Sequence, residues 1–181
     1  GVYIQNVCAD QNAYGFIADE ASSVSANSIV VQEVHSQRFE GTGVFADSNY
    51  GHAVGIEIDK AQLESGSGNL LLAAQTISND ASASWGIRLS KLVDVSVGKI
   101  LVDDVSSDKS SATGLEMDGS YSVNDGVFVS NIASRYSAEG VTLSGELSTD
   151  TIYVSDVKSE NSGSVGLGVG GNSALTVPQT D

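Results

Sequence analysis

Short segments that begin with glycine and continue with alternating apolar residues return along this chain about once every 26 to 28 residues. A short strand that recurs at a nearly fixed period is the signature of a solenoid, in which each repeat stacks on the one before it. The repeat therefore predicts a continuous core that neighbouring rungs share. The six copies begin at Gly15, Gly55, Gly86, Gly114, Gly140 and Gly166.

A second apolar strand lies between successive glycine-led units. Its copies read apolar, any residue, apolar, two mostly polar residues, apolar, as in Ile152 to Val157. Residues two apart face the same side of a strand, so the first two apolar positions point inward and the polar pair predicts a corner. The copies start at residues 2, 29, 72, 100, 127 and 152. The long step of 43 residues between the second and third copies predicts a loop inserted near residues 41–54.

These patterns predict an all-β solenoid of about six coils over residues 1–170, with residues 171–181 as a tail or linker. Neither end shows the polar cap that solenoids need, so we expect a segment of a longer protein. The net charge of −15 argues against nucleic acid and against anionic membranes as partners, because both attract basic surfaces. No apolar run is long enough for a transmembrane helix.

The sequence gives no sign of a cofactor or a resident metal. Cys8 is the only cysteine, which leaves no disulfide framework and no cysteine-based metal site. The turns Asp118-Gly119-Ser120 and Asn124-Asp125-Gly126 carry oxygen ligands of the kind that calcium binds, but they lack the EF-hand spacing and are interpreted as plain turns.

Stacking turns the repeat into columns of equivalent residues about 4.8 Å apart. The apolar residues after each glycine, together with the apolar positions of the second strand, form the inward columns and the expected core. One outward column of the first strand reads Glu57, Arg88, Glu116, Thr142 and Gly168, and the next contains Asp59, Ser90 and Asp118.

The acidic face offers two interpretations. Glu57 and Glu116 lie two rungs apart, or about 9.6 Å along the stack, which is compatible with the wide carboxyl separation of an inverting glycosidase. In this interpretation Glu57 and Glu116 or Asp118 act as acid and base, Arg88 orients the substrate, and Asp59 helps to bind it. The other interpretation is a surface charge ladder of Glu–Arg–Glu pairs that contributes little to stability.

The outward column of the second strand is mainly apolar and reads Tyr3, Val30, Ala73, Leu101, Phe128 and Tyr153. Exposed apolar patches mark interaction sites. The row is therefore a subunit contact, a surface covered by a loop, or a platform on which Phe128 and Tyr153 stack against sugar rings. His52 falls in the expected inserted loop, as a general base or as a solvated loop residue.

The repeat resembles the right-handed parallel β-helix of the pectate-lyase-like superfamily. The resemblance rests on the glycine-led strand, the second strand with its Asn or Asp corner, and the Ser/Asn-rich turns, as in residues 154–161. Within that superfamily the pattern is most similar to bacteriophage tailspikes and other polysaccharide-degrading β-helices. No catalytic motif of these families matches residue by residue, so no site is carried over.

The resemblance implies a tailspike-like module, in a virion tail or otherwise extracellular, that binds a bacterial surface polysaccharide and in its enzymatic form depolymerises it. It also implies a homotrimer with three parallel copies around an axis, for which the apolar row is the expected contact. Sedimentation of the protein with Phe128 and Tyr153 changed to Ser tests that contact. Two alternatives remain open, namely a secreted polysaccharide lyase or epimerase and a structural stalk or adhesin without an active site.

Overall fold

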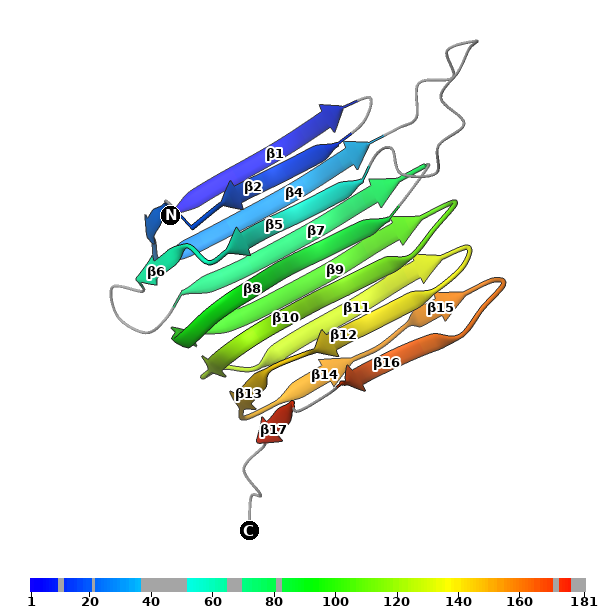
Figure 1. Cartoon of the computed structure of the whole chain (residues 1–181). Helices are drawn as coiled ribbons and strands as arrows, with labels where there is room; N and C mark the ends of the chain where they lie inside the picture. Colours follow the sequence, from blue (N-terminus) through cyan, green and yellow to red (C-terminus); the bar gives the residue numbers. More distant parts are fainter. Residues whose placement is uncertain are drawn as a thin grey trace.

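A computed structural model describes residues 1–9, 12–20, 22–36, 52–64, 70–80, 83–170 and 173–176, with the backbone alone for 62–64 and 91–95. These residues form strands and no helix, stacked as a parallel β-solenoid of about five turns (Figure 1). Six successive strands in each sheet path are separated by five steps, which accounts for the turns. The architecture matches the predicted right-handed parallel β-helix in kind.

Each turn contributes one strand to each of two long sheets. Sheet A contains β1 (Val2–Ala9), β4 (Ser28–Ser36), β7 (Leu71–Asn79), β9 (Lys99–Ser107), β11 (Val127–Ser134), β14 (Ile152–Val154) and β15 (Val157–Ser159). Sheet B contains β2 (Ala13–Ala18), β5 (Ala53–Asp59), β8 (Ser84–Val97), β10 (Ala112–Val123), β12 (Ala138–Leu143), β13 (Glu146–Thr149), β16 (Ser164–Val169) and β17 (Ala174–Thr176). A third, short pair joins β3 (Ser23–Ser25) to β6 (Gln62–Glu64).

The strand register confirms the predicted columns. Ile56 pairs with Ile87, which pairs with Leu115, and all three side chains are fully buried. The same holds in sheet A, where the inward positions of β4, β7, β9 and β11 lie in the core. On the last described rung of these columns, Leu167 and Val169 are 39% and 49% exposed, because no later strand among the described residues stacks on them.

The glycine that opens each unit is required by the close approach of the two sheets. A Cβ atom built on Gly86 would lie 2.5 Å from the carbonyl oxygen of Gly114 on the next rung and would collide with Val102 of the opposite sheet. Equivalent collisions occur at Gly15, Gly55, Gly114 and Gly140. Real Cβ atoms do not approach a backbone oxygen so closely, so the repeating glycine sets the distance between the sheets.

The predicted polar corner of the second strand is a column of residues with left-handed backbone. Its six members are Asn6, Glu33, Thr76, Asp104, Asn131 and Asp156, with φ between 52° and 58°. A residue in this conformation breaks the alternation of the strand, so the next apolar residue points inward again. Asn and Asp tolerate this region better than other non-glycine residues. Four of the six are Asn or Asp, which explains why the corner is recognisable in the sequence.

Two boundaries differ from the prediction. The loop expected near residues 41–54 lies mostly outside the described residues, but β5 already begins at Ala53, so residues 53 and 54 belong to sheet B. Within the expected tail, Ala174–Thr176 form β17 and pair in parallel with β13. Leu175 packs against the core, which favours this pairing.

We predict that Gly86→Ala lowers the free energy of unfolding by about 1 to 3 kcal/mol, the usual cost of overpacking a filled interior. Urea denaturation of the wild type and the variant measures the difference. Gly163→Ala is the matched control, because a Cβ at Gly163 meets no atom within 4 Å, and its effect should stay within about 0.5 kcal/mol. Equal effects of the two substitutions would show that the glycine column does not set the sheet spacing.

Candidate functional site

The outer face of sheet B carries two adjoining columns of functional side chains. Before each glycine lies one outward residue, and these pair across the rungs as Tyr14, Val54, Trp85, Thr113 and Glu139. The glycine and the next apolar residue then point inward. The residue after them points outward again, which gives the second column as Ile17, Glu57, Arg88, Glu116 and Thr142.

Arg88 is the centre of this face. Its guanidinium lies 3.6 Å from Glu57 Oε1 and 3.7 Å from Glu116 Oε2, and its Cζ atom lies 4.7 Å from the centre of the Trp85 ring. The predicted Glu–Arg–Glu arrangement is therefore present, with an aromatic ring stacked against the cation. All three charged side chains reach the surface in part, with Arg88 28% and Glu57 18% exposed.

The two ion pairs leave hydrogen-bonding capacity unused. Both separations exceed the normal length of a hydrogen bond. Glu57 Oε2 and Arg88 Nε are buried, and among the described residues neither atom has a hydrogen-bond partner. Arg88 Nε is also the atom that lies 3.7 Å from Glu116 Oε2. Buried polar atoms normally have a hydrogen-bond partner, so an acceptor and a donor that lack one on adjacent rungs point to a missing polar partner.

Tyr14, His52 and Trp85 form an aromatic cluster beside Arg88. Tyr14 Oη lies 2.5 Å from His52 Nε2, and the His52 ring packs edge-on against Tyr14 and Trp85 with centroid distances of 5.1 and 6.0 Å. Val54 lies between Tyr14 and Trp85 in the outward column, yet it is fully buried and is not part of the core cluster. It is therefore covered from the outside, which makes this cluster a small ordered layer on sheet B.

Charge and burial shift the ionisation of three groups in the cluster. Burial raises the pKa of Glu57, with smaller contributions from Asp59 and Glu116, while Arg88 acts in the opposite direction. Burial and the charge of Arg88 lower the pKa of His52, so its imidazole is neutral at pH 7. Burial and the charge of Glu57 raise the pKa of Tyr14, which keeps its hydroxyl protonated. The site thus holds proton donors and acceptors beside a fixed cation.

The structure brings some of the predicted site residues together and separates others. Glu57, Arg88 and Glu116 are in contact, and Asp59 and Asp118 lie in the next column, joined through Ser90. Phe128 and Tyr153 lie on sheet A, in the second-strand column where the sequence placed them, and so they do not share this face.

On sheet A the apolar row has the predicted register, but its exposure varies. Tyr3 and Tyr153 are 61% and 56% exposed, Ala73 is buried, and the Phe128 ring is covered by Lys99 with its Nζ atom 4.7 Å from the centroid. The row is thus less open in its middle than the sequence suggested.

Sequence reasoning missed Tyr14 and Trp85 and placed His52 in a loop. His52 precedes β5 and is held there by backbone bonds, since its carbonyl accepts from Ala13 and its amide donates to Asn12 Oδ1. The signal was the residue before each glycine. The glycine must point inward because the two sheets approach each other closely. Since side chains alternate along a strand, the residue before the glycine then points outward.

Among the described residues, no three His, Cys, Asp or Glu side chains gather as ligands for a metal ion, and no helix could cross a membrane. The chain matches no protein-family model, no curated protein and no solved structure at a significant level. What the geometry establishes is a parallel β-solenoid with an ordered aromatic and charged cluster on one sheet.

We predict that the Glu57 carboxyl titrates above its ordinary pKa of 4.5 when followed by carbon NMR. Arg88→Gln should raise this pKa further, because the nearby positive charge that favours the ionised carboxylate is lost. Lys99→Gln removes a cation from the opposite sheet and should leave it unchanged. A Glu57 midpoint at or below 4.5, or one that does not respond to Arg88→Gln, would contradict the coupling.

The raised pKa of Glu57 also makes the stability of the fold depend on pH. Because the folded pKa of Glu57 is raised, the stability linked to this group is fully present below its unfolded pKa and is lost as the pH rises through the folded pKa. The wild type should therefore lose stability relative to Glu57→Gln as the pH rises from about 4.5. Denaturation of both proteins across this range gives the difference.

Proposed function

We propose that the outer face of sheet B binds a polysaccharide chain, with Trp85 as the stacking surface and Glu57, Arg88 and Glu116 as polar contacts. The observation that carries this proposal is that Glu57 Oε2 and Arg88 Nε, beside an aromatic ring, both lack a hydrogen-bond partner among the described residues. A sugar hydroxyl both donates and accepts hydrogen bonds, so a hydroxyl presented here satisfies both atoms after a small shift of the two side chains. The apolar face of the sugar ring fits Trp85.

The setting we propose is an extracellular or virion-tail β-solenoid of the tailspike kind that recognises a bacterial surface polysaccharide. The resemblance of the repeat supports this setting. The strongly acidic chain also supports it, because a high net charge favours solubility and an acidic protein does not attract nucleic acid or anionic membranes. In the expected homotrimer the exposed ends of the sheet A row, Tyr3 and Tyr153, are available for contact. Sheet B then remains free for the glycan.

Binding can be tested on a panel of bacterial capsular and cell-wall polysaccharides by calorimetry. We expect Trp85→Ala to weaken binding about tenfold or more, as truncation of a buried aromatic anchor does, and Trp85→Phe to retain most of it. Tyr153→Ala, on the opposite sheet, is the control and should bind like the wild type. Loss of binding in Tyr153→Ala alone would move the sugar platform to sheet A, and no binding to any polysaccharide would favour the structural stalk.

Hydrolysis is the second candidate, favoured by the raised pKa of Glu57. A carboxyl group with a raised pKa keeps its proton to a higher pH and can donate it to the glycosidic oxygen. Glu116 lies two rungs further along the same column, about 9.6 Å by stacking, which leaves room for the water molecule that an inverting glycosidase activates with its second carboxylate. Arg88 lies between the two and holds both in place.

If the face hydrolyses its glycan, Glu57→Gln should lower turnover by about a hundredfold or more while the polysaccharide still binds. Release of reducing ends measures turnover, and ultraviolet absorption by unsaturated uronates would reveal a lyase instead. The matched control is Glu146→Gln on β13, which removes an exposed carboxylate of the same sheet and should change nothing. Full activity in Glu57→Gln would reduce the Glu–Arg–Glu arrangement to a charge ladder.

A further inference from the structure

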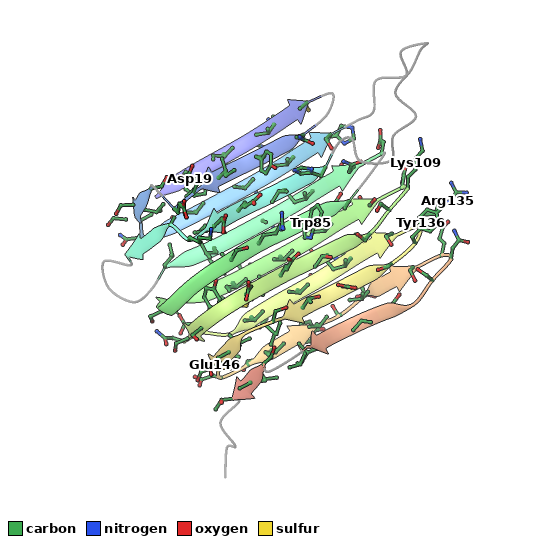
Figure 2. All side chains as sticks on the ribbon, viewed as in Figure 1. Asp19, Trp85, Lys109, Arg135, Tyr136 and Glu146 are labelled. Atoms are coloured by element: carbon green, nitrogen blue, oxygen red, sulfur yellow. The ribbon has the colours of Figure 1, made fainter. Side chains whose placement is uncertain are left out.

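A groove lies at the edge of the solenoid where three successive turns lead from sheet A to sheet B. It has a volume of about 580 Å³ and lies over the turns that follow β9, β11 and β15. In Figure 2 the labelled side chains of Lys109, Arg135 and Tyr136 gather at this end of the molecule. The groove is separate from the Trp85 and Arg88 cluster.

The groove arises from a difference in turn length. The strands pair in register on both sides of the turns, with Ser107, Ser134 and Ser159 aligned before them and Ala112, Ala138 and Ser164 aligned after them. Four residues, 108–111, span the first turn and four, 160–163, span the third, but only three, 135–137, span the middle one. The middle turn is therefore recessed between two longer neighbours.

A buried serine at the floor of the groove has no hydrogen-bond partner. Ser107 Oγ accepts from the amide of Ser110, and Ser159 Oγ donates to the carbonyl of Ser162. The aligned Ser134 is 6% exposed and lines the groove, yet among the described residues its Oγ bonds to nothing. Its own short turn supplies no partner, so this hydroxyl can bond to a ligand in the groove once its side chain rotates toward it.

Three cations gather at the rim although the chain is strongly acidic. Lys109, Arg135 and Lys158 line the groove against two carboxylates, Asp108 and Glu160. Arg135 is 4.0 Å from Glu160, with both side chains more than half exposed, so this pair is weak. Lys158 lies 3.2 Å from Asp156. Within the described part of the chain Lys109 has no ion pair, and three of the eight Lys and Arg residues thus meet at one groove.

We propose that this groove binds the anionic group of an acidic sugar, that is, a carboxylate, sulfate or phosphate carried on the glycan. Ser134 Oγ donates a hydrogen bond to an oxygen of the anion, Lys109 and Arg135 supply the positive charge, and the half-exposed Tyr136 flanks the sugar ring. This inference rests on the proposed function, because the natural ligand of the groove is the same polysaccharide. It adds that this polysaccharide is acidic.

The two sites lie along one edge of the molecule. Trp85 is the second residue of β8, and the turns of the groove lead into β10, β12 and β16, which follow β8 in sheet B. At about 4.8 Å per rung the groove begins within roughly 5 to 15 Å of Trp85 along the stack. A glycan chain that runs along the solenoid axis at this edge can therefore contact Trp85 with one sugar and the groove with another.

Small sugars test the groove without any polysaccharide. In a nitrogen-15 NMR titration, glucuronate, glucose 6-phosphate and glucose 6-sulfate are compared with neutral glucose. We expect at least one anionic sugar to shift the amide signals of Ser134 to Ser137, and glucose to leave them in place. The three anions distinguish a carboxylate, a phosphate and a sulfate ligand. Equal shifts with glucose, or none with any anionic sugar, would overturn the proposal.

Variants separate the groove from a general charge effect. Arg135→Gln and Lys109→Gln should each weaken binding of the anionic sugar about tenfold, the loss typical of a hydrogen bond to a charged group. Ser134→Ala should weaken it about threefold or more without lowering the stability of the ligand-free protein, because the unpaired hydroxyl contributes nothing there. Lys60→Gln, which removes a cation paired with Glu20 outside the groove, is the control. An equal loss in Lys60→Gln would show that only net charge matters.

The outcomes distinguish this proposal from the proposed function. Polysaccharide binding that depends on Trp85 but is unaffected by Arg135→Gln leaves the proposed function standing and rejects the groove. Anionic sugars that bind at Ser134 while no polysaccharide binds at all keep the groove as an anion site and reject the glycan-binding face. Binding that weakens with both Trp85→Ala and Arg135→Gln supports a single acidic chain that spans the two.

Discussion

The close approach of the two sheets at the glycine column is the constraint on which the rest of the molecule depends. At Gly86 the opposite sheet and the next rung occupy the space that any side chain would need. The glycine must therefore point inward, and the apolar residue after it also points inward. Two consecutive inward residues break the alternation of the strand, and this break sets Trp85 and Arg88 on the outside with a gap of two residues between them. The geometry of the candidate site follows from the packing of the core.

In a stack, the side chains of one outward column lie next to one another, so they must be compatible in charge and in hydrogen bonding. Like charges on adjacent rungs repel, and the column Glu57, Arg88, Glu116 avoids this by alternation. On sheet A, neutral polar side chains form hydrogen bonds along the stack: Tyr3 donates a hydrogen bond to Gln32, and Gln32 donates one to Gln75. Such pairs contribute little each, so their main effect is to hold neighbouring side chains in one arrangement. A site built on these columns is therefore ordered before any ligand arrives.

The sequence was sufficient for the columns because a period and a strand geometry determine which residues become neighbours. Glu57, Arg88 and Glu116 were identified in this way, and the register confirms them. Trp85 was not, because the inward turn of Gly86 depends on contact with Val102 in the other sheet, which no local pattern contains. His52 was identified only as a candidate base in a loop, and its place in the aromatic cluster was not predicted, because its ring is positioned by Tyr14, a residue 38 positions earlier.

The polar corner illustrates a finer limit. Asn and Asp at four of its six positions made the corner visible, but Glu33 and Thr76 adopt the same left-handed backbone although such residues rarely do. Their conformation is imposed by the rungs on either side, whose hydrogen bonds fix the path of the chain. Local preference therefore predicts the column as a whole better than it predicts any one member.

This solenoid can bind a ligand at the places where its sequence departs from the repeat. A residue that obeys the repeat is satisfied by its neighbours above and below, as Ser107 and Ser159 are by their own turns. The turn after Ser134 is one residue shorter, and in the described part of the chain its hydroxyl has no hydrogen-bond partner, below a rim of three cations and two carboxylates. Trp85 departs similarly, as the one indole ring in a column that also contains Tyr14, Val54, Thr113 and Glu139. Among the described residues, the buried polar atoms without a hydrogen-bond partner are Ser134 Oγ at the groove and Glu57 Oε2 and Arg88 Nε near Trp85. Such atoms are costly unless a ligand completes their hydrogen bonds. That cost is the physical reason to assign function to these two places.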